Sequence, residues 1–145
     1  MVRDVIRRVL EAQPEYSAEN TPAMQRRGEL IRKQMTGWIE GLLPELRAVS
    51  VEDLRVDASD GKGLRSEIPW VRVHSASRSP RATDGWYVVY LFDACGEAVF
   101  LTLIQGTTKW NGGSPVDRPL AELRARVAWA RTALTPALGQ RPDLV

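Results

Sequence analysis

Apolar positions in the first third of the chain recur every three or four residues, which is the spacing of a helix that buries one face. This pattern predicts two amphipathic helices, over residues 2–13 and 22–43. Thr21 and Pro22 have the residue types of an N-cap and a first-turn proline, and Pro44 is expected to kink or stop the second helix. We interpret both helices as packing elements.

The middle of the chain instead alternates between apolar and polar residues, which is typical of half-buried strands. Aromatic and β-branched runs separated by glycine-containing turns predict a mixed or antiparallel sheet of about four strands within residues 53–105. The predicted strands are residues 53–58, 70–74, 86–92 and 98–104.

Helical spacing returns over residues 118–133, after a glycine-containing stretch at 106–115 that we interpret as a loop. Residues 136–145 contain prolines and a glycine and are expected to be a tail or the start of a linker. A sheet flanked by N-terminal and C-terminal helices is an α+β fold, so we expect a single α+β domain over residues 1–135.

Composition places the chain among ordinary globular proteins, because 43% of its 145 residues are hydrophobic and 26% are charged. The single cysteine and single histidine exclude an internal disulfide and a Cys/His zinc cluster. We find neither a signal peptide nor an apolar run long enough to span a membrane, and we expect a cytoplasmic protein.

The net charge of +2 is small, but basic residues concentrate in one stretch. Residues 55–81 hold six basic and three acidic side chains, a local charge of +3 that suits a few phosphates. The basic residues are Arg55, Lys62, Arg65, Arg72, Arg78 and Arg81.

Common catalytic motifs are missing from the sequence. The stretch around Lys62 lacks the glycine-rich run and the GK[ST] ending of a phosphate-binding loop. A metal-dependent nuclease would have to use Asp57, Asp60 and Glu67 with Lys62, but no lysine lies two residues after Glu67. We therefore expect no catalytic residues, no cofactor and no metal ion, with the nuclease kept as a lesser alternative.

Three local features remain to be explained. Gly61-Lys62-Gly63 forms a turn whose glycines allow close approach to another molecule. Ile68-Pro69-Trp70 places a proline directly before a strand that opens with tryptophan. In the strand of residues 86–92, Tyr87 and Leu91 are predicted to share one face, with the other face packed on helices.

Together these features resemble the McrB N-terminal domain family, the recognition domain of McrBC-type, methylcytosine-dependent restriction systems. The resemblance runs from Leu54 to about Gly113, roughly 60 of 145 residues, and includes the spacing between the matching pieces. Those pieces are Leu54-Arg55-Val56, Gly61-Lys62-Gly63, Ile68-Pro69-Trp70, and Asp84-Gly85-Trp86-Tyr87 with the strand to Leu91.

The resemblance implies a non-catalytic domain that binds methylated cytosine by flipping the base into a pocket. It places the pocket at Trp70, Tyr87 and Leu91, and the Ser66 hydroxyl is a further candidate for the cytosine edge. The family's best-known member has a tyrosine between the two glycines, where this chain has Lys62, so we expect Lys62 to contact a phosphate or the orphaned guanine instead. The loop expected to enter the duplex is Gly61, Lys62, Gly63 and Leu64, and the arginines expected on phosphates are Arg55, Arg65, Arg72, Arg78 and Arg81.

The expected partner is double-stranded DNA carrying 5-methylcytosine, or 5-hydroxymethylcytosine, with a nuclease or motor domain fused or associated. In this interpretation the chain is the specificity module of a type IV restriction system in phage defence. The alternative from another class is a protein–protein docking module, in which the helices bind a partner and every aromatic residue is structural.

Overall fold

The computed structural model describes residues 1–145 except 142 and 145. Its internal contacts separate two compact units, Met1–Gly106 and Thr107–Val145. Both contain helix and strand, so the expected α+β class is confirmed.

The first unit starts with helix α1 (Val2–Ala12) and a 3-10 turn, η1 (Gln13–Glu15), in agreement with the predicted helix over residues 2–13. A long helix follows, and the Thr21 hydroxyl accepts the Met24 N–H at its start, as expected for an N-cap. This helix is built from α2 (Pro22–Glu29), a π-helical segment η2 (Leu30–Met35) and α3 (Thr36–Val49).

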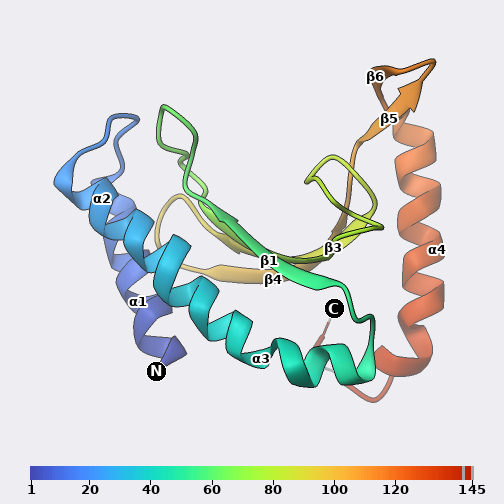
Figure 1. Ribbon diagram of the computed structural model, residues 1–145, viewed down its shortest axis with the longest axis horizontal. Helices are drawn as coiled ribbons and strands as arrows, with labels where there is room; N and C mark the ends of the chain where they lie inside the picture. The colour runs from blue at the N-terminus through green and yellow to red at the C-terminus, as the bar shows by residue number, and fades with distance from the viewer. Residues whose placement is uncertain (142, 145) are drawn as a thin grey trace. The chain divides into compact units, whose positions relative to one another are not determined.

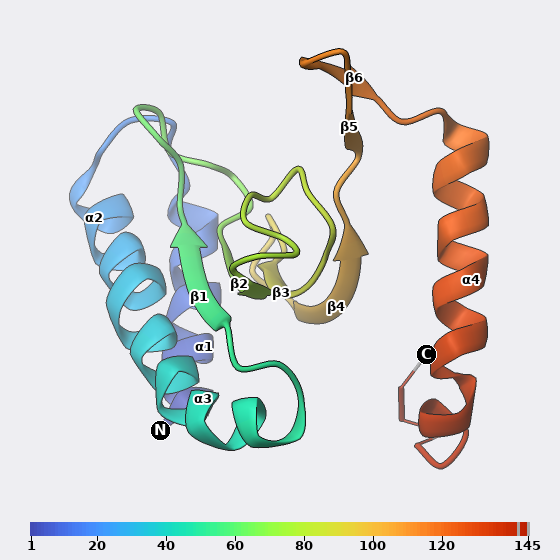
Figure 2. The ribbon, with the colours of Figure 1, turned by 45° about the vertical axis from the view of Figure 1, so that its right-hand side comes forward.

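The predicted end of the long helix at residue 43 is wrong. The helix continues to Val49 with Pro44 inside it, and its last turns change direction (Figures 1 and 2). Two tertiary contacts explain the continuation: Leu43 is buried in the core, and the Arg47 guanidinium donates to the Leu54 carbonyl at 2.7 Å. These contacts therefore outweigh the destabilising effect of a proline inside a helix.

Four strands form an antiparallel sheet in chain order, and each lies within one residue of its predicted range. The strands are β1 (Leu54–Ser59), β2 (Trp70–Ser75), β3 (Trp86–Phe92) and β4 (Val99–Gln105).

The sheet has one apolar face, and the helices α1, α2 and α3 gather on that side (Figure 1). Val71 and Phe92 of the sheet pack there against Val9, Ile31 and Met35 of the helices, and all five are fully or almost fully buried. Such a core stabilises the unit through burial of apolar area. Because side chains alternate along a strand, this core also determines which strand positions point to the opposite face of the sheet.

The second unit consists of a hairpin, β5 (Thr108–Asn111) and β6 (Ser114–Asp117), followed by helix α4 (Leu120–Leu138) (Figure 2). The hairpin corrects the prediction of a plain loop at residues 106–115. Gly112 and Gly113 have φ values of 57° and 85°, and two positive φ values make a two-residue hairpin turn favourable.

Helix α4 is longer than the predicted helix over residues 118–133 and includes Pro136. Its final turn is closed by the Gly139 N–H, which donates to the Thr135 carbonyl at 2.8 Å. The division into a domain ending at residue 135 and a tail from 136 remains a prediction, and Pro142 of that tail lies outside the described residues. No helix among the described residues is long and apolar enough to cross a membrane.

Candidate functional site

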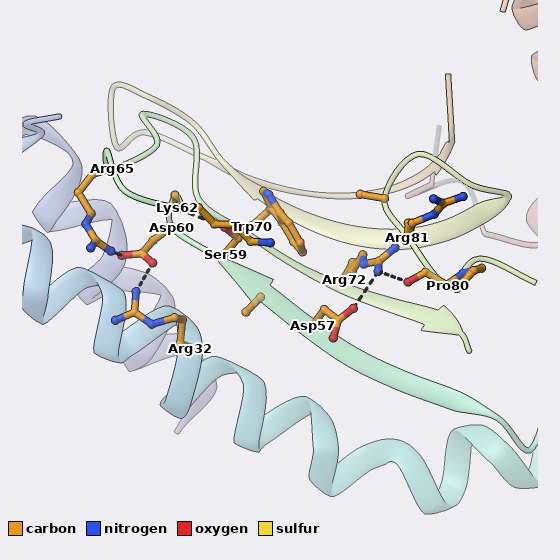
Figure 3. A pocket seen from close by; sticks show the side chains of 13 residues that line it. Arg32, Asp57, Ser59, Asp60, Lys62, Arg65, Trp70, Arg72, Pro80 and Arg81 are labelled. Atoms are coloured by element: carbon orange, nitrogen blue, oxygen red, sulfur yellow. Dashed lines mark hydrogen bonds and ion pairs between the residues drawn. The ribbon is translucent and has the colours of Figure 1, made fainter. Parts of the chain in front are cut away.

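A cavity of about 670 Å³ opens between two loops of the first unit, with side chains of β1 and β2 between them (Figure 3). We call residues 60–69, which join β1 to β2, the Gly61 loop, and residues 76–85, which join β2 to β3, the Arg81 loop. The lining residues are Arg32, Asp57, Ala58, Ser59, Asp60, Gly61, Lys62, Arg65, Trp70, Arg72, Pro80, Arg81 and Ala82.

Trp70 occupies the middle of this cavity in the close view (Figure 3). It is the first residue of β2, it is half-buried, and it follows the fully buried Pro69. In register it pairs with Leu91 of β3 on the sheet face away from the helices. An indole held this way can offer a flat apolar surface to a planar ligand.

The Gly61 loop is held at its base by a buried carboxylate. Asp60 is only 1% exposed, and it forms ion pairs with Arg32 of η2 and, at 3.1 Å, with Arg65 of the same loop. The Asp60 carbonyl accepts the Ser66 N–H at 2.6 Å, which closes the loop upon itself. Gly61 has a φ of 112°, and a Cβ there would lie 2.3 Å from the Leu64 carbonyl oxygen, so only glycine fits.

The same loop is also held against the helical layer by a buried cation, Arg27. Arg27 is fully buried and donates to the Gln13 side chain at 2.7 Å and to the Ser66 carbonyl at 2.6 Å. Burial lowers the pKa of Arg27, and its guanidinium also lies over the Tyr16 ring. The loop therefore has a fixed base, whereas Leu64 near its tip is 69% exposed.

The Arg81 loop is anchored at its start by Asp53. The Asp53 carboxylate accepts hydrogen bonds from the Ser77 N–H and hydroxyl and from the Ser75 hydroxyl. These bonds favour the charged form and lower the pKa of Asp53 to about 2. The carboxylate therefore stays ionised at neutral pH and orders the loop.

Side chains on the open face of the sheet hold the rest of the Arg81 loop. Arg72, only 4% exposed, donates to the Pro80 carbonyl at 3.0 Å and pairs with Asp57 at 2.8 Å. His74 Nδ1 donates to the Ser79 carbonyl at 2.7 Å, and its Nε2 lies 2.8 Å from the Asp57 carboxylate. Hydrogen bonds and ion pairs thus hold both loops at the edges of the cavity against the rest of the first unit.

Tyr87 supports this loop from beneath. Its hydroxyl donates to the Ala82 carbonyl at 2.8 Å, and the Arg72 guanidinium lies 5.2 Å from the centre of its ring. Burial raises the pKa of Tyr87, and the nearby Arg72 opposes that rise. The ring is 8% exposed and does not line the cavity, so its contact with a ligand would require movement of Arg72 and the loop.

The cavity has a positive charge. Five basic and two acidic side chains line it, which leaves +3. Each carboxylate is already engaged, Asp57 by Arg72 and His74 and Asp60 by Arg32 and Arg65. This positive charge favours the binding of an anionic ligand over that of a cation.

The predicted site residues divide into two groups. The cavity collects six of them, namely Gly61, Lys62, Arg65, Trp70, Arg72 and Arg81. The others lie outside its lining, namely Arg55, Gly63, Leu64, Ser66, Arg78, Tyr87 and Leu91. The Ser66 hydroxyl donates to the Ile68 carbonyl at 3.0 Å, and Arg55 and Arg78 are exposed elsewhere on the unit.

The nuclease alternative needed Asp57, Asp60 and Glu67 to act together on a metal ion. Within the part of the chain that the structure describes, no three His, Cys, Asp or Glu side chains form such a group. Asp57 and Asp60 neutralise arginines, while Glu67 is exposed and its carbonyl accepts the Gln13 amide at 3.0 Å. These contacts do not favour metal binding.

The sequence did not predict that Arg32 belongs to the site, nor that the Asp60 carboxylate forms ion pairs with Arg32 and Arg65. Arg32 lies in a helix that we interpreted only as packing, and 28 positions separate it from Asp60. The one local signal is Gly28, one helical turn earlier, where a Cβ would lie 2.5 Å from the Asp60 carboxylate.

Taken together, the fold and the cavity define a small α+β binding module with a cationic site around a tryptophan. The chain matches the family model described as the MrcB-like, N-terminal domain over residues 8–142, and it belongs to that family. The resemblance predicted from the sequence is confirmed and extends over nearly the whole chain. Membership indicates a DNA-binding or restriction-related role for a recognition domain rather than a catalytic one. Comparisons with curated proteins and with solved structures gave no match.

Proposed function

We propose that this domain binds duplex DNA carrying methylated cytosine and takes the modified base, flipped out of the helix, into the cavity beside Trp70. The observation that carries the proposal is the position of Trp70 between two anchored loops with basic side chains. A planar base can stack on the indole while the DNA backbone meets cationic edges.

The energies are of the right size for such a mechanism. Extruding a base costs a few kcal/mol, and stacking on an aromatic side chain returns about 1–3 kcal/mol. Burial of one methyl group contributes roughly 0.8 kcal/mol, which is only a factor of about four in affinity. Discrimination between cytosine and its methylated form must therefore also use the shape of the cavity.

In this proposal the site residues have distinct tasks. Trp70 stacks on the base. Leu91, its register partner on the same face, lies outside the cavity lining, so for Leu91 to contact the methyl group the base must reach past the indole toward β3. Tyr87 positions Arg72 and the Arg81 loop. Lys62, which is exposed and lies two residues before the exposed Leu64, is on the part of the Gly61 loop that meets the duplex.

We further propose that the domain is the non-catalytic specificity module of a type IV restriction system that acts in phage defence. A nuclease or motor domain, fused or associated, would then cut the DNA. The protein–protein docking alternative makes a different physical prediction, because an apolar interface is far less sensitive to salt than a phosphate-binding surface.

The test is a fluorescence-anisotropy titration with one duplex that carries cytosine, 5-methylcytosine or 5-hydroxymethylcytosine at a single position. We expect tighter binding of a modified duplex and a slope of log K against log salt of about −2.7, from a cavity charge of +3. Equal binding of all three duplexes would contradict modified-base recognition. Absence of DNA binding would favour the docking alternative.

A further inference from the structure

Arg32 extends from the long helix into the cavity, although the rest of its segment belongs to the core. Leu30, Ile31 and Met35 of η2 are buried against the sheet, while Arg32 is 46% exposed and lines the cavity. The segment is π-helical, and π-helical turns inside α-helices occur frequently at functional sites. The long helix therefore contributes one side chain, Arg32, to the lining of the cavity.

The helix leaves space for the Arg32 side chain at Gly28. A Cβ on Gly28 would lie 2.5 Å from a guanidinium nitrogen of Arg32 and 2.5 Å from the Asp60 carboxylate. Glycine inside a helix is destabilising relative to alanine, because it loses more conformational freedom on folding. At this position the absence of a side chain lets the Arg32–Asp60 pair lie directly against the helix backbone.

The charges of this cluster do not cancel. Arg32 and Arg65 pair with the two oxygens of the single Asp60 carboxylate, which leaves a net charge of +1. Asp60 is buried, so it holds both guanidinium groups in fixed orientations before any ligand arrives. A guanidinium has five N–H donors, and the exposed part of Arg32 keeps donors available to the cavity.

The cluster also has a suitable place in the cavity. In the close view it lies at one end, Arg81 lies at the other, and Trp70 lies between them (Figure 3). A nucleotide whose base stacks on Trp70 carries a phosphate on either side of its sugar. The planar guanidinium group of arginine can donate two parallel hydrogen bonds to phosphate oxygens.

We propose that Arg32 and Arg65, held by Asp60, form a phosphodiester-binding site for the DNA backbone beside the flipped nucleotide. This inference rests on the proposed function, to which it adds Arg32 as a DNA contact from the helical layer. The site is sequence-independent, because phosphate contacts position the DNA and do not read its bases.

The experiment compares the charge-removing variant Arg32→Gln with the matched control Arg8→Gln, which removes an exposed arginine of α1 that does not line the cavity. For Arg32→Gln we expect roughly tenfold weaker binding of modified and unmodified duplexes alike, and a salt slope smaller by about 0.9. Arg8→Gln should bind like the parent protein.

A third variant protects the test against loss of folding. Arg32→Lys keeps a cation beside Asp60 but not the planar fork, so it should fold, keep the parent salt slope and bind within a few-fold of the parent. Urea unfolding of each variant verifies the fold. An unchanged affinity and salt slope in folded Arg32→Gln overturns the inference, and so does a change confined to one duplex, which would indicate base contact.

Failure of the proposed function has a different signature. If the parent protein does not distinguish the modified duplex, the base-reading function is refuted whatever Arg32 does. If the parent distinguishes it and Arg32→Gln has no effect, only the phosphate site is refuted.

Discussion

Replacement of Trp70 by alanine is the most direct test of how the cavity works. Trp70 lines the cavity and is half-buried, so truncation removes the stacking surface while the core under the sheet stays intact. Loss of about 1–3 kcal/mol of stacking raises Kd for the modified duplex by roughly 5- to 150-fold.

The effect on selectivity follows from the same geometry. Binding that rests only on phosphates does not use the indole, so Trp70→Ala should weaken the modified duplex more than the unmodified one. The ratio of the two Kd values should therefore approach one. Trp70→Phe keeps an aromatic ring and should recover most of the preference.

The loss of stability must be measured separately. Complete burial of a large apolar side chain contributes about 1.5–3 kcal/mol, so a half-buried tryptophan should contribute about half of that to the free energy of unfolding. Urea denaturation gives this value, and the anisotropy titration is performed well below the unfolding transition.

Phe100→Ala is the matched control. Phe100 is an aromatic residue of β4 on the same sheet face, 56% exposed and absent from the cavity lining. It should leave both affinity and selectivity unchanged. If folded Trp70→Ala keeps the parent Kd for the modified duplex within about twofold, stacking on Trp70 is refuted.

Three further predictions concern the scaffold. Gly61→Ala should reduce the free energy of unfolding by more than Gly63→Ala, because both have positive φ but only the Gly61 Cβ would strike the Leu64 carbonyl; urea denaturation that ranks them equally would contradict this. Asp53→Asn should destabilise the protein at neutral pH; because the folded pKa of about 2 lies below the ordinary value of 3.8, the difference from the parent should persist above pH 4 and vanish as pH falls through 2, and a difference constant with pH would refute the argument. Phe92→Ala, at a fully buried position, should lower the free energy of unfolding by about 3–5 kcal/mol, measured by the same denaturation, and a loss below 1 kcal/mol would show that this core is not packed as described.

The local order of the chain was predictable because it follows from short-range periodicity. Strands alternate with period two and helices with period 3.6, and both periods are visible in the apolar residues of the sequence. Element ends were less predictable where tertiary contacts decide them. Contacts made by Leu43 and Arg47 stabilise α3 beyond Pro44. These contacts cannot be predicted from the residues that neighbour Pro44 in the sequence.

The sequence by itself determined the α+β class, the four-stranded sheet and the family, and it placed Tyr87 and Leu91 on one face of their strand through alternation alone. Only the tertiary structure decided which side chains of the site contact one another. It placed Tyr87 beneath Arg72 and brought Arg32 to Asp60 across 28 positions. The physical reason is that burial of a carboxylate or a ring depends on packing between distant elements, whereas periodicity reports only on neighbours along the chain.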